Sequence, residues 1–336
     1  MLLKKQIITL NDGTTTEAQA PVIISASRST DIPAFYSDWF INRWEAGYIR
    51  WTNPFNGKPL YVSFANARVV VFWTKNPRPM FKYLDWLDKN TPQYYFQYSL
   101  NDYDAEGYEA KVPSVESRIK SFKELSQRVG KKRVVWRFDP LILTKEIDID
   151  ELLRRIKKIG DELHNYTEKL VFSFVDIGIY QKVQSNLDKE QVPYIEWSTE
   201  LMDEFASKLS ELNKAWNLQL ATCSEKIDLQ KYKIAHNKCV DDDLMIELFS
   251  HDKELMDFLG VEIQQADLFS DGEVVKTKKL KDKGQREDCG CIVAKDIGAY
   301  NTCPHECNYC YANVSKQVAK RNYESYLSDK NKESII

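Results

Sequence analysis

The chain has 336 residues, of which 43% are hydrophobic, 29% charged and 12% aromatic. These proportions are typical of a folded protein with a buried core and exclude a disordered or fibrous chain. The net charge of −3 provides no overall positive field, so a nucleic acid would have to bind a local patch. Lys276 to Arg286 is the obvious basic stretch, but a solvated surface loop explains it better.

The apolar run after Met1 is too short for a signal peptide, and no segment is apolar over the length of a bilayer. We therefore expect a cytoplasmic protein that does not bind membranes. All seven cysteines lie between Cys223 and Cys310. In a reducing compartment, clustered thiols are more often metal ligands than disulfides.

Short β-rich apolar runs alternate with segments of helical periodicity along the chain. The predicted strands are residues 22–26, 69–73, 94–99, 133–137, 170–174 and 218–222. Helices are predicted at residues 115–129 and 149–163, where apolar residues recur at helical spacing. A hairpin is predicted at residues 48–64, with its turn at Asn53 to Gly57. Strands that alternate with helices indicate parallel pairing and an α/β fold.

Polar residues follow each predicted strand. They are Ser27 to Asp31, Thr74 to Pro77, Ser99 to Asn101, Arg137 to Pro140, Ser173 with Asp176, and Thr222 to Glu225. In a barrel of parallel strands the carboxyl ends meet on one face, so we expect these groups to share a pocket. Each residue taken alone is equally well explained as a turn or a helix cap.

Cys303, Cys307 and Cys310 form the strongest pattern in the sequence. Three thiolates with this spacing can ligate three irons of a 4Fe–4S cluster from one loop and leave the fourth iron open. A structural zinc ion would normally need four protein ligands, so the triad argues against zinc unless His305 joins it. The spacing therefore favours a cluster that can bind a substrate.

This spacing, with Tyr309 directly before the last cysteine, resembles the radical S-adenosylmethionine superfamily. The resemblance implies that Cys303, Cys307 and Cys310 hold a 4Fe–4S cluster and that Tyr309 packs near the adenine of S-adenosylmethionine. It also implies reductive cleavage to a 5′-deoxyadenosyl radical, which would act on a small-molecule or other unknown substrate. An electron donor such as flavodoxin or ferredoxin would be the partner.

Residues 300–313, with residues 74–77 and 98–140, resemble the spore photoproduct lyase-like branch of that superfamily. The whole chain resembles a family called domain of unknown function 1848, whose name supplies no reaction. In most of the superfamily the cysteine loop follows the first barrel strand, whereas here it lies at residues 303–310. The order is thus circularly permuted, with residues 295–302 as the strand ordinarily first and residues 22–26 as the second.

The expected fold is a circularly permuted, incomplete TIM-type (β/α) barrel of the radical SAM type, with six or seven parallel strands. Residues 1–20 would be an N-terminal extension and residues 21–336 a single domain. Within it, residues 223–291 would carry an auxiliary metal site, and residues 295–336 the cluster-binding strand, loop and helix.

Two further groups complete the expected site. Cys223, Cys239, Cys289 and Cys291 could hold a second 4Fe–4S cluster or a zinc ion; alternatively, Cys223 donates a hydrogen atom to a substrate radical. The Gly-Gly-Glu stretch that often binds the methionine amino group in the superfamily is absent. Expected cofactor-binding residues are therefore the polar strand ends Arg28, Lys75, Ser99 and Arg137. The alternative for each cation is an ion pair with a strand-end acid such as Asp31 or Asp139.

Two other functions remain open from the sequence alone. The cysteines would also suit an iron–sulfur electron-transfer or redox-sensing protein without radical chemistry. The lyase-like resemblance and the basic stretch suggest a protein that binds or repairs nucleic-acid lesions. The acidic net charge makes nucleic acid the weakest of these partners.

Overall fold

The computed structural model describes residues 4–175, 177–178, 181–263 and 274–336. Its centre is a sheet of eight parallel strands, ordered β13-β12-β10-β8-β7-β6-β3-β16. These strands are β3 (Ile23–Ala26), β6 (Val69–Thr74), β7 (Tyr94–Ser99), β8 (Val134–Leu141), β10 (Lys169–Phe174), β12 (Gln219–Thr222), β13 (Ile234–His236) and β16 (Lys295–Asp296).

Strands β6 and β7 show why the central sheet forms where it does. Five of the six residues in each strand are buried, and the buried residues follow one another instead of alternating with exposed ones. Continuous runs are expected where a parallel sheet is covered on both faces. Phe72 and Phe96 stack in neighbouring strands with ring centroids 5.1 Å apart, and each fully buried phenylalanine contributes about 1.5–3 kcal/mol.

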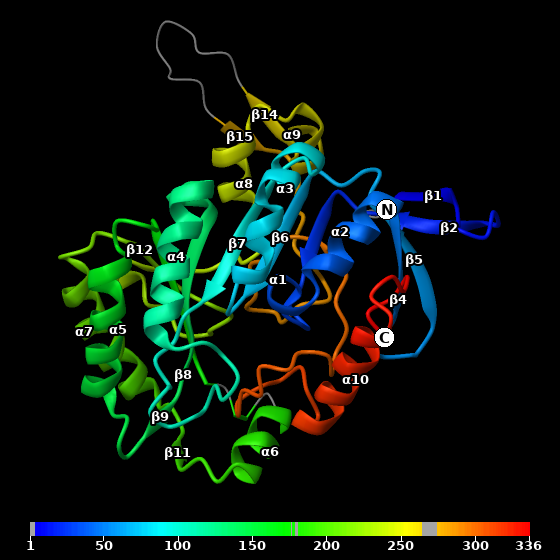
Figure 1. Ribbon diagram of the computed structural model, residues 1–336. Coiled ribbons are helices and arrows are strands. Elements are labelled where there is room, and N and C mark those ends of the chain that lie inside the picture. The colour runs from blue at the N-terminus through cyan, green and yellow to red at the C-terminus, as the bar shows by residue number, and fades with distance from the viewer. Residues whose placement is uncertain (1–3, 176, 179–180, 264–273) are drawn as a thin grey trace, which may run out of the picture.

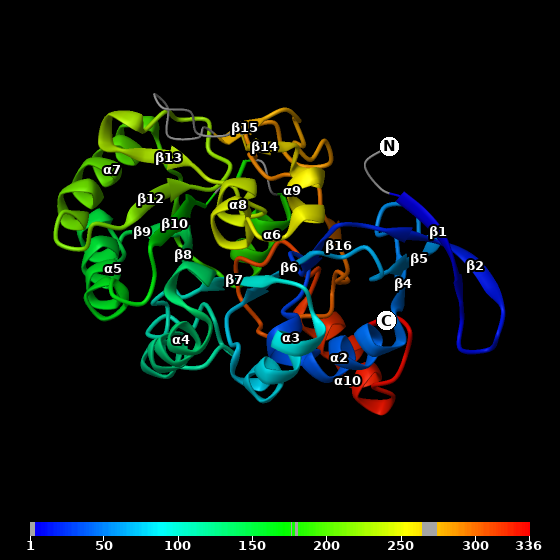
Figure 2. The same ribbon diagram turned by 90° about the horizontal axis from the view of Figure 1, so that it is seen from above.

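The sheet curves, and helices line its outer side, as the view from above shows (Figure 2). The outer helices are α2 (Ser37–Ala46), α3 (Leu84–Asn90), α4 (Val115–Val129), α5 (Ile149–Leu163), α7 (Thr199–Asn213) and α10 (Lys316–Ser328). The remaining helices are α1 (Ile32–Phe35), α6 (Gln181–Lys189), α8 (Asp242–Phe249) and α9 (Lys253–Leu259). No helix in the described residues combines the length and the apolar character needed to cross a membrane.

Helices α4 and α5 have the bounds that their periodicity predicts. Each begins after a polar cap: Ser114 Oγ accepts from the amide of Ser117 at 3.3 Å, and Asp148 Oδ1 from that of Glu151 at 2.9 Å. Such caps satisfy amide groups that have no partner within the helix. Helix α4 stops at Gly130, whose φ is 95°, a conformation that glycine adopts without strain.

Strand β16 lies beside β3, where the sequence places it. It comes after the other seven strands in the sequence but pairs with β3, with Lys295 opposite Ile24 and Asp296 opposite Ser25. The paired segment covers two residues rather than the expected 295–302. The cysteine loop follows this strand directly.

The central sheet has eight strands, one more than the upper expected number of seven. All seven predicted strands are present, and β13 adds an eighth at the edge beside β12. It escaped prediction because three residues are too few to show a period. The described residues show an open order of strands, with β13 and β16 at its two ends.

A smaller sheet lies beside the large one, in the order β1-β2-β5-β4 (Figure 1). The predicted hairpin is confirmed as β4 (Tyr48–Thr52) and β5 (Pro59–Ser63), which pair antiparallel. Strands β1 (Lys4–Thr9) and β2 (Thr15–Ala20) form a second hairpin from the predicted N-terminal extension. Two short pairs complete the fold: β9 (Leu143–Thr144) with β11 (Tyr194–Ile195), and β14 (Val261–Ile263) with β15 (Val274–Lys276).

Candidate functional site

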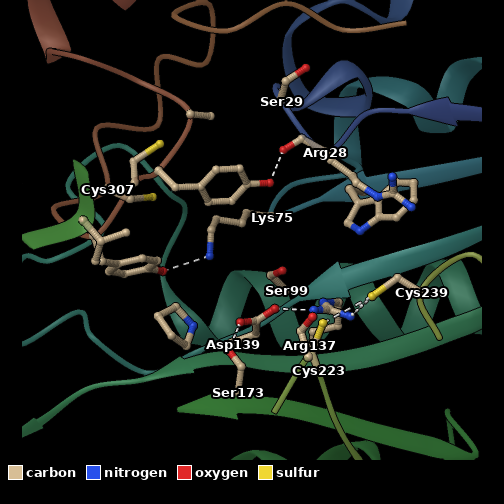
Figure 3. Close-up of a pocket in the computed structure, with 18 of the residues that line it drawn as sticks. Arg28, Ser29, Lys75, Ser99, Arg137, Asp139, Ser173, Cys223, Cys239 and Cys307 are labelled. Atoms are coloured by element: carbon tan, nitrogen blue, oxygen red, sulfur yellow. Dashed lines mark hydrogen bonds and ion pairs between the residues drawn. The ribbon is translucent and has the colours of Figure 1, made fainter. Parts of the chain in front are cut away.

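A cavity of about 310 Å³ opens at the carboxyl ends of the central strands. All seven cysteines of the chain line it, together with the predicted pocket residues Arg28, Lys75, Ser99, Arg137, Ser173 and Tyr309. Figure 3 shows Cys307 at one side of the cavity and Cys223 and Cys239 at the other. The expected convergence of polar strand ends and cysteines is therefore present among the described residues; Asp176, expected in the same series, lies outside them.

The loop that carries Cys303, Cys307 and Cys310 is fixed by hydrogen bonds to its backbone carbonyls. Asn313 Nδ2 donates to the carbonyl of Cys303 at 2.7 Å, and Asn186 Nδ2 in α6 donates to that of Cys310 at 2.7 Å. The buried Tyr36 hydroxyl donates to the carbonyl of Thr302 at 2.6 Å. These contacts hold the backbone and leave the three thiol groups free to face the cavity.

A second loop, residues 101–114, lies against the cysteine loop. Glu109 and Cys307 form an antiparallel bridge. The amide of Lys111 donates to the carbonyl of His305 at 3.0 Å, and that of Asn308 to the carbonyl of Tyr108 at 2.9 Å. The cysteine loop is thus paired along its backbone in the manner of a short strand.

Glu109 lies at the centre of a buried ion network beside Cys307. Its carboxylate accepts from Lys75 Nζ at 2.7 Å and from Arg118 Nη1 at 2.9 Å. The Tyr309 hydroxyl also donates to it, and Asn101 Nδ2 donates to that hydroxyl at 2.9 Å. Burial alone would raise the pKa of Glu109, but Lys75 and Arg118 outweigh burial and lower it. Glu109 is therefore an anion that orients Lys75 and Tyr309.

His305 is a buried residue of the cavity lining. It is 2% exposed, and its Nε2 is 2.8 Å from Asp31 Oδ2. The same carboxylate oxygen accepts from the amide of Lys75 at 2.7 Å. Asp31 also caps α1 through the amide of Ala34. His305 therefore ties the cysteine loop to the ends of β3 and β6.

Asp296 joins β16 to the polar end of β3. Its carboxylate accepts from Ser25 Oγ at 2.6 Å, from Ser27 Oγ at 2.8 Å and from the amide of Arg28 at 2.7 Å. It also accepts from the amide of Gly298 at 2.9 Å. A side chain at Gly298 would place its Cβ 2.0 Å from Ser27 Oγ, so only glycine fits this approach of the two strands.

The other four cysteines line the same cavity from other segments. Cys223 follows β12, Cys239 follows β13, and Cys289 and Cys291 belong to the segment before β16. The Sγ atoms of Cys223 and Cys239 are 3.6 Å apart. A hydrogen bond with Cys291 lowers the pKa of Cys289 to about 7. Cys223 and Cys291, which are 68 residues apart in the sequence, thus line the same cavity.

The three thiols of the cysteine loop suit a positively charged metal centre. Burial raises the pKa of Cys303, Cys307 and Cys310, because water is absent where a thiolate would need it. Lys75 opposes this effect for Cys307 and Cys310 but does not overcome it. A metal centre supplies the missing positive charge and deprotonates its ligands on binding.

A separate acidic cluster, Asp241 to Asp243, brings three carboxylates within 4.8 Å of one another. Its charge is already compensated, since Lys238 and Lys276 both pair with Asp242 and Asp243. Asp241 caps α8. These contacts account for the cluster without a metal ion.

One family model covers most of the chain. A family model described as Domain of unknown function (DUF1848) matches residues 23–312. The chain belongs to the DUF1848 family. The DUF1848 match runs from the first residue of β3 past Cys310, so it includes all seven cysteines. No curated protein and no solved structure matches the chain.

Within the DUF1848 region, the predicted cationic residues are already paired. Lys75 pairs with Glu109, and Arg137 pairs with Asp139 while its Nη1 donates to Cys239 Sγ at 3.0 Å. Arg28 lies 3.8 Å from Asp282 and stacks over Trp73. For Arg137 the alternative of an ion pair with a strand-end acid is confirmed. Arg137 therefore faces the second group of cysteines.

Glu109 is the site residue that sequence reasoning missed. It lies in a loop without periodicity, between β7 and α4, and no metal-ligand or catalytic pattern includes it. The available signal was indirect. Arg118 faces inward from α4 and is 1% exposed, and a buried cation requires an anion. From the sequence alone, nothing identified which of the nearby acids that anion was.

Proposed function

We propose that this protein is a radical S-adenosylmethionine enzyme with its catalytic cluster on Cys303, Cys307 and Cys310. The main support is the position of these three cysteines, which are spaced for a three-ligand cluster. They line the same cavity as the polar ends of β3, β6, β7, β8 and β10. When bound, a 4Fe–4S cluster of this kind delivers one electron to the sulfonium of S-adenosylmethionine, which yields methionine and a 5′-deoxyadenosyl radical.

The proposal includes the architecture. The curved parallel sheet with helices on its outer side (Figure 2) suits an incomplete, circularly permuted (β/α) barrel. In that reading β16 is the strand ordinarily first, α10 is its helix and β3 is the strand ordinarily second. The pairing of β16 with β3 supports this order.

The chain's own residues would bind and shield the ligand. Tyr309 is held by Glu109, Lys75 and Asn101, so its ring stays fixed beside the cysteine loop. Lys75 Nζ keeps its charge there, because Glu109 raises its pKa against the opposing effect of burial. That ammonium can attract the carboxylate of the methionine moiety while it remains bonded to Glu109. Ser99 offers a hydroxyl on the same wall.

The test is anaerobic product analysis. Reconstituted protein, reduced with dithionite, should convert S-adenosylmethionine slowly into 5′-deoxyadenosine and methionine without any further substrate. Cys303→Ala, Cys307→Ala and Cys310→Ala should each abolish this conversion. Circular dichroism shows whether each variant is folded. A loaded cluster that binds no S-adenosylmethionine and forms no 5′-deoxyadenosine would refute the enzyme and leave an electron-transfer protein.

A further inference from the structure

The four cysteines outside the 303–310 loop form a continuous group. Cys223 contacts Cys239, with 3.6 Å between their sulfurs. The backbone amide of Cys239 donates to Cys291 Sγ, and Cys289 lies two residues before Cys291 and lines the same cavity. Backbone pairing holds this arrangement, since the amide of Ile292 donates to the carbonyl of Val240 at 3.1 Å. Three separate segments thus bring four thiols together.

Hydrogen-bond donors surround two of these sulfurs. Cys239 Sγ accepts from Arg137 Nη1 at 3.0 Å and from Asn237 Nδ2 at 3.3 Å. Cys291 Sγ accepts from the amides of Cys239 at 3.2 Å and Val240 at 3.4 Å. A neutral thiol is a weak acceptor, whereas a thiolate or metal-bound sulfur is a strong one. The surroundings therefore suit sulfurs that carry negative charge.

The charge around the group calls for a metal centre. Two guanidinium groups, Arg28 and Arg137, act on these sulfurs, and Arg28 Nη2 is buried without a hydrogen-bond partner. Asp139, Asp282 and Asp296 act on the same two arginines. If all four thiols were ionised, their charge and that of these carboxylates would exceed the two positive charges, and buried charge without compensation is costly, so four thiolates here require a further cation. A bound metal centre supplies the balance.

The spacing of the sulfurs favours a cluster over a single ion. A tetrahedral zinc ion with Zn–S bonds of about 2.3 Å requires every pair of sulfurs to lie about 3.8 Å apart. The Cys223–Cys239 pair alone is close to that distance, at 3.6 Å, but among the described residues no three cysteine sulfurs lie within 4.8 Å of one another, so the four sulfurs together are spread too widely for one zinc ion. An iron–sulfur cube places its ligands around a larger core.

We infer that Cys223, Cys239, Cys289 and Cys291 ligate a second 4Fe–4S cluster, which forms the wall of the cavity opposite Cys307. With a protein ligand on each iron, this centre takes up or delivers one electron but binds no substrate. Cys223 is then a metal ligand rather than a hydrogen-atom donor. Arg137 is a positioning residue whose charge favours the reduced cluster, since hydrogen bonds and charge near the sulfurs set the potential.

The experiment removes the first site entirely, so its outcome is independent of the proposed enzyme activity. A Cys303→Ala/Cys307→Ala/Cys310→Ala protein is reconstituted anaerobically with ferrous iron and sulfide. We expect about four iron and four sulfide per chain, against about eight of each for the unaltered protein. The reduced variant should show an electron paramagnetic resonance signal. One zinc without sulfide, a Cys223–Cys239 disulfide, or no bound metal would each overturn the inference.

The role of Arg137 has its own measurement in the same triple-alanine protein. Arg137→Gln should keep the iron content and shift the reduction potential of the remaining cluster to a more negative value. Arg137→Lys, which retains the positive charge, should leave the reduction potential close to that of the protein with Arg137. Arg154→Gln is the matched control, because Arg154 is 64% exposed on α5. An unchanged potential in Arg137→Gln with full iron content would refute the assignment of Arg137.

Discussion

Replacing Glu109 with Gln tests how strongly the buried ion network stabilises the fold around the cysteine loop. The Glu109 side chain is fully buried, as is that of Arg118, and Lys75 is 16% exposed. Gln keeps the size of the side chain but leaves two cations without their shared anion. Breaking a buried pair in this way costs about 3–5 kcal/mol. Urea denaturation followed by circular dichroism should show a loss of this size at pH 7.

The pH dependence gives the same prediction a second, independent check. The pKa of Glu109 is lowered in the folded protein, whereas an unfolded glutamate titrates near pH 4.3. The contribution of the Glu109 carboxylate to the free energy of unfolding is therefore fully present above about pH 4.3. It is lost as the pH falls toward the pKa that Glu109 has in the folded protein. The difference in unfolding free energy between the unaltered protein and Glu109→Gln should be constant at neutral pH and shrink in acid.

Glu162→Gln is the matched control for both measurements. Glu162 is 54% exposed and pairs with Lys123 on the surface, and exposed pairs contribute about 0.2–1 kcal/mol. The reasoning would be refuted if Glu109→Gln lost no more stability than this control. It would also be refuted if the difference grew as the pH fell below about 4.

Two further variants test the junction between β16 and β3. Gly298→Ala should lower the free energy of unfolding by about 1–3 kcal/mol through overpacking, because the new Cβ would meet Ser27. Gly178→Ala is the control and should change the free energy of unfolding little, because its Cβ would meet no atom within 4 Å. Asp296→Asn turns one acceptor oxygen into a donor facing other donors, which should cost about 1–3 kcal/mol. Amide hydrogen exchange at Gly298 should then speed up, and an unchanged rate would contradict the role of Asp296.

Local features of this chain were predictable because their causes are local. Helices α4 and α5 follow from periodicity and from their caps at Ser114 and Asp148, which act within four residues. The central strands follow from short β-rich apolar runs. Strand β13 lacks such a run, since it has only three residues and two of them are exposed. Its pairing with β12 depends on the neighbouring strand rather than on its own sequence.

The sequence predicted which residues line the candidate site but not which of them contact one another. A shared pocket for Arg28, Lys75 and Arg137 follows from the rule that parallel strands end on one face. Which acid neutralises which cation depends on loops, and the partner of Lys75 is Glu109 from a loop without periodicity. The nearness of Cys239 to Arg137 depends likewise on a long-range contact. Sequence spacing carries no information about either distance.

Strand β16 also has a consequence for the order of events during synthesis. Ser25 leaves the ribosome 271 positions before Asp296, which at about 5–20 residues per second corresponds to roughly 14–54 s. For that time the outer edge of β3 lacks its partner, and unpaired edges promote aggregation. The loop with Cys303, Cys307 and Cys310 emerges later still. If the proposed cluster binds this loop, its iron can be taken up only after the strands that surround the cavity have been made.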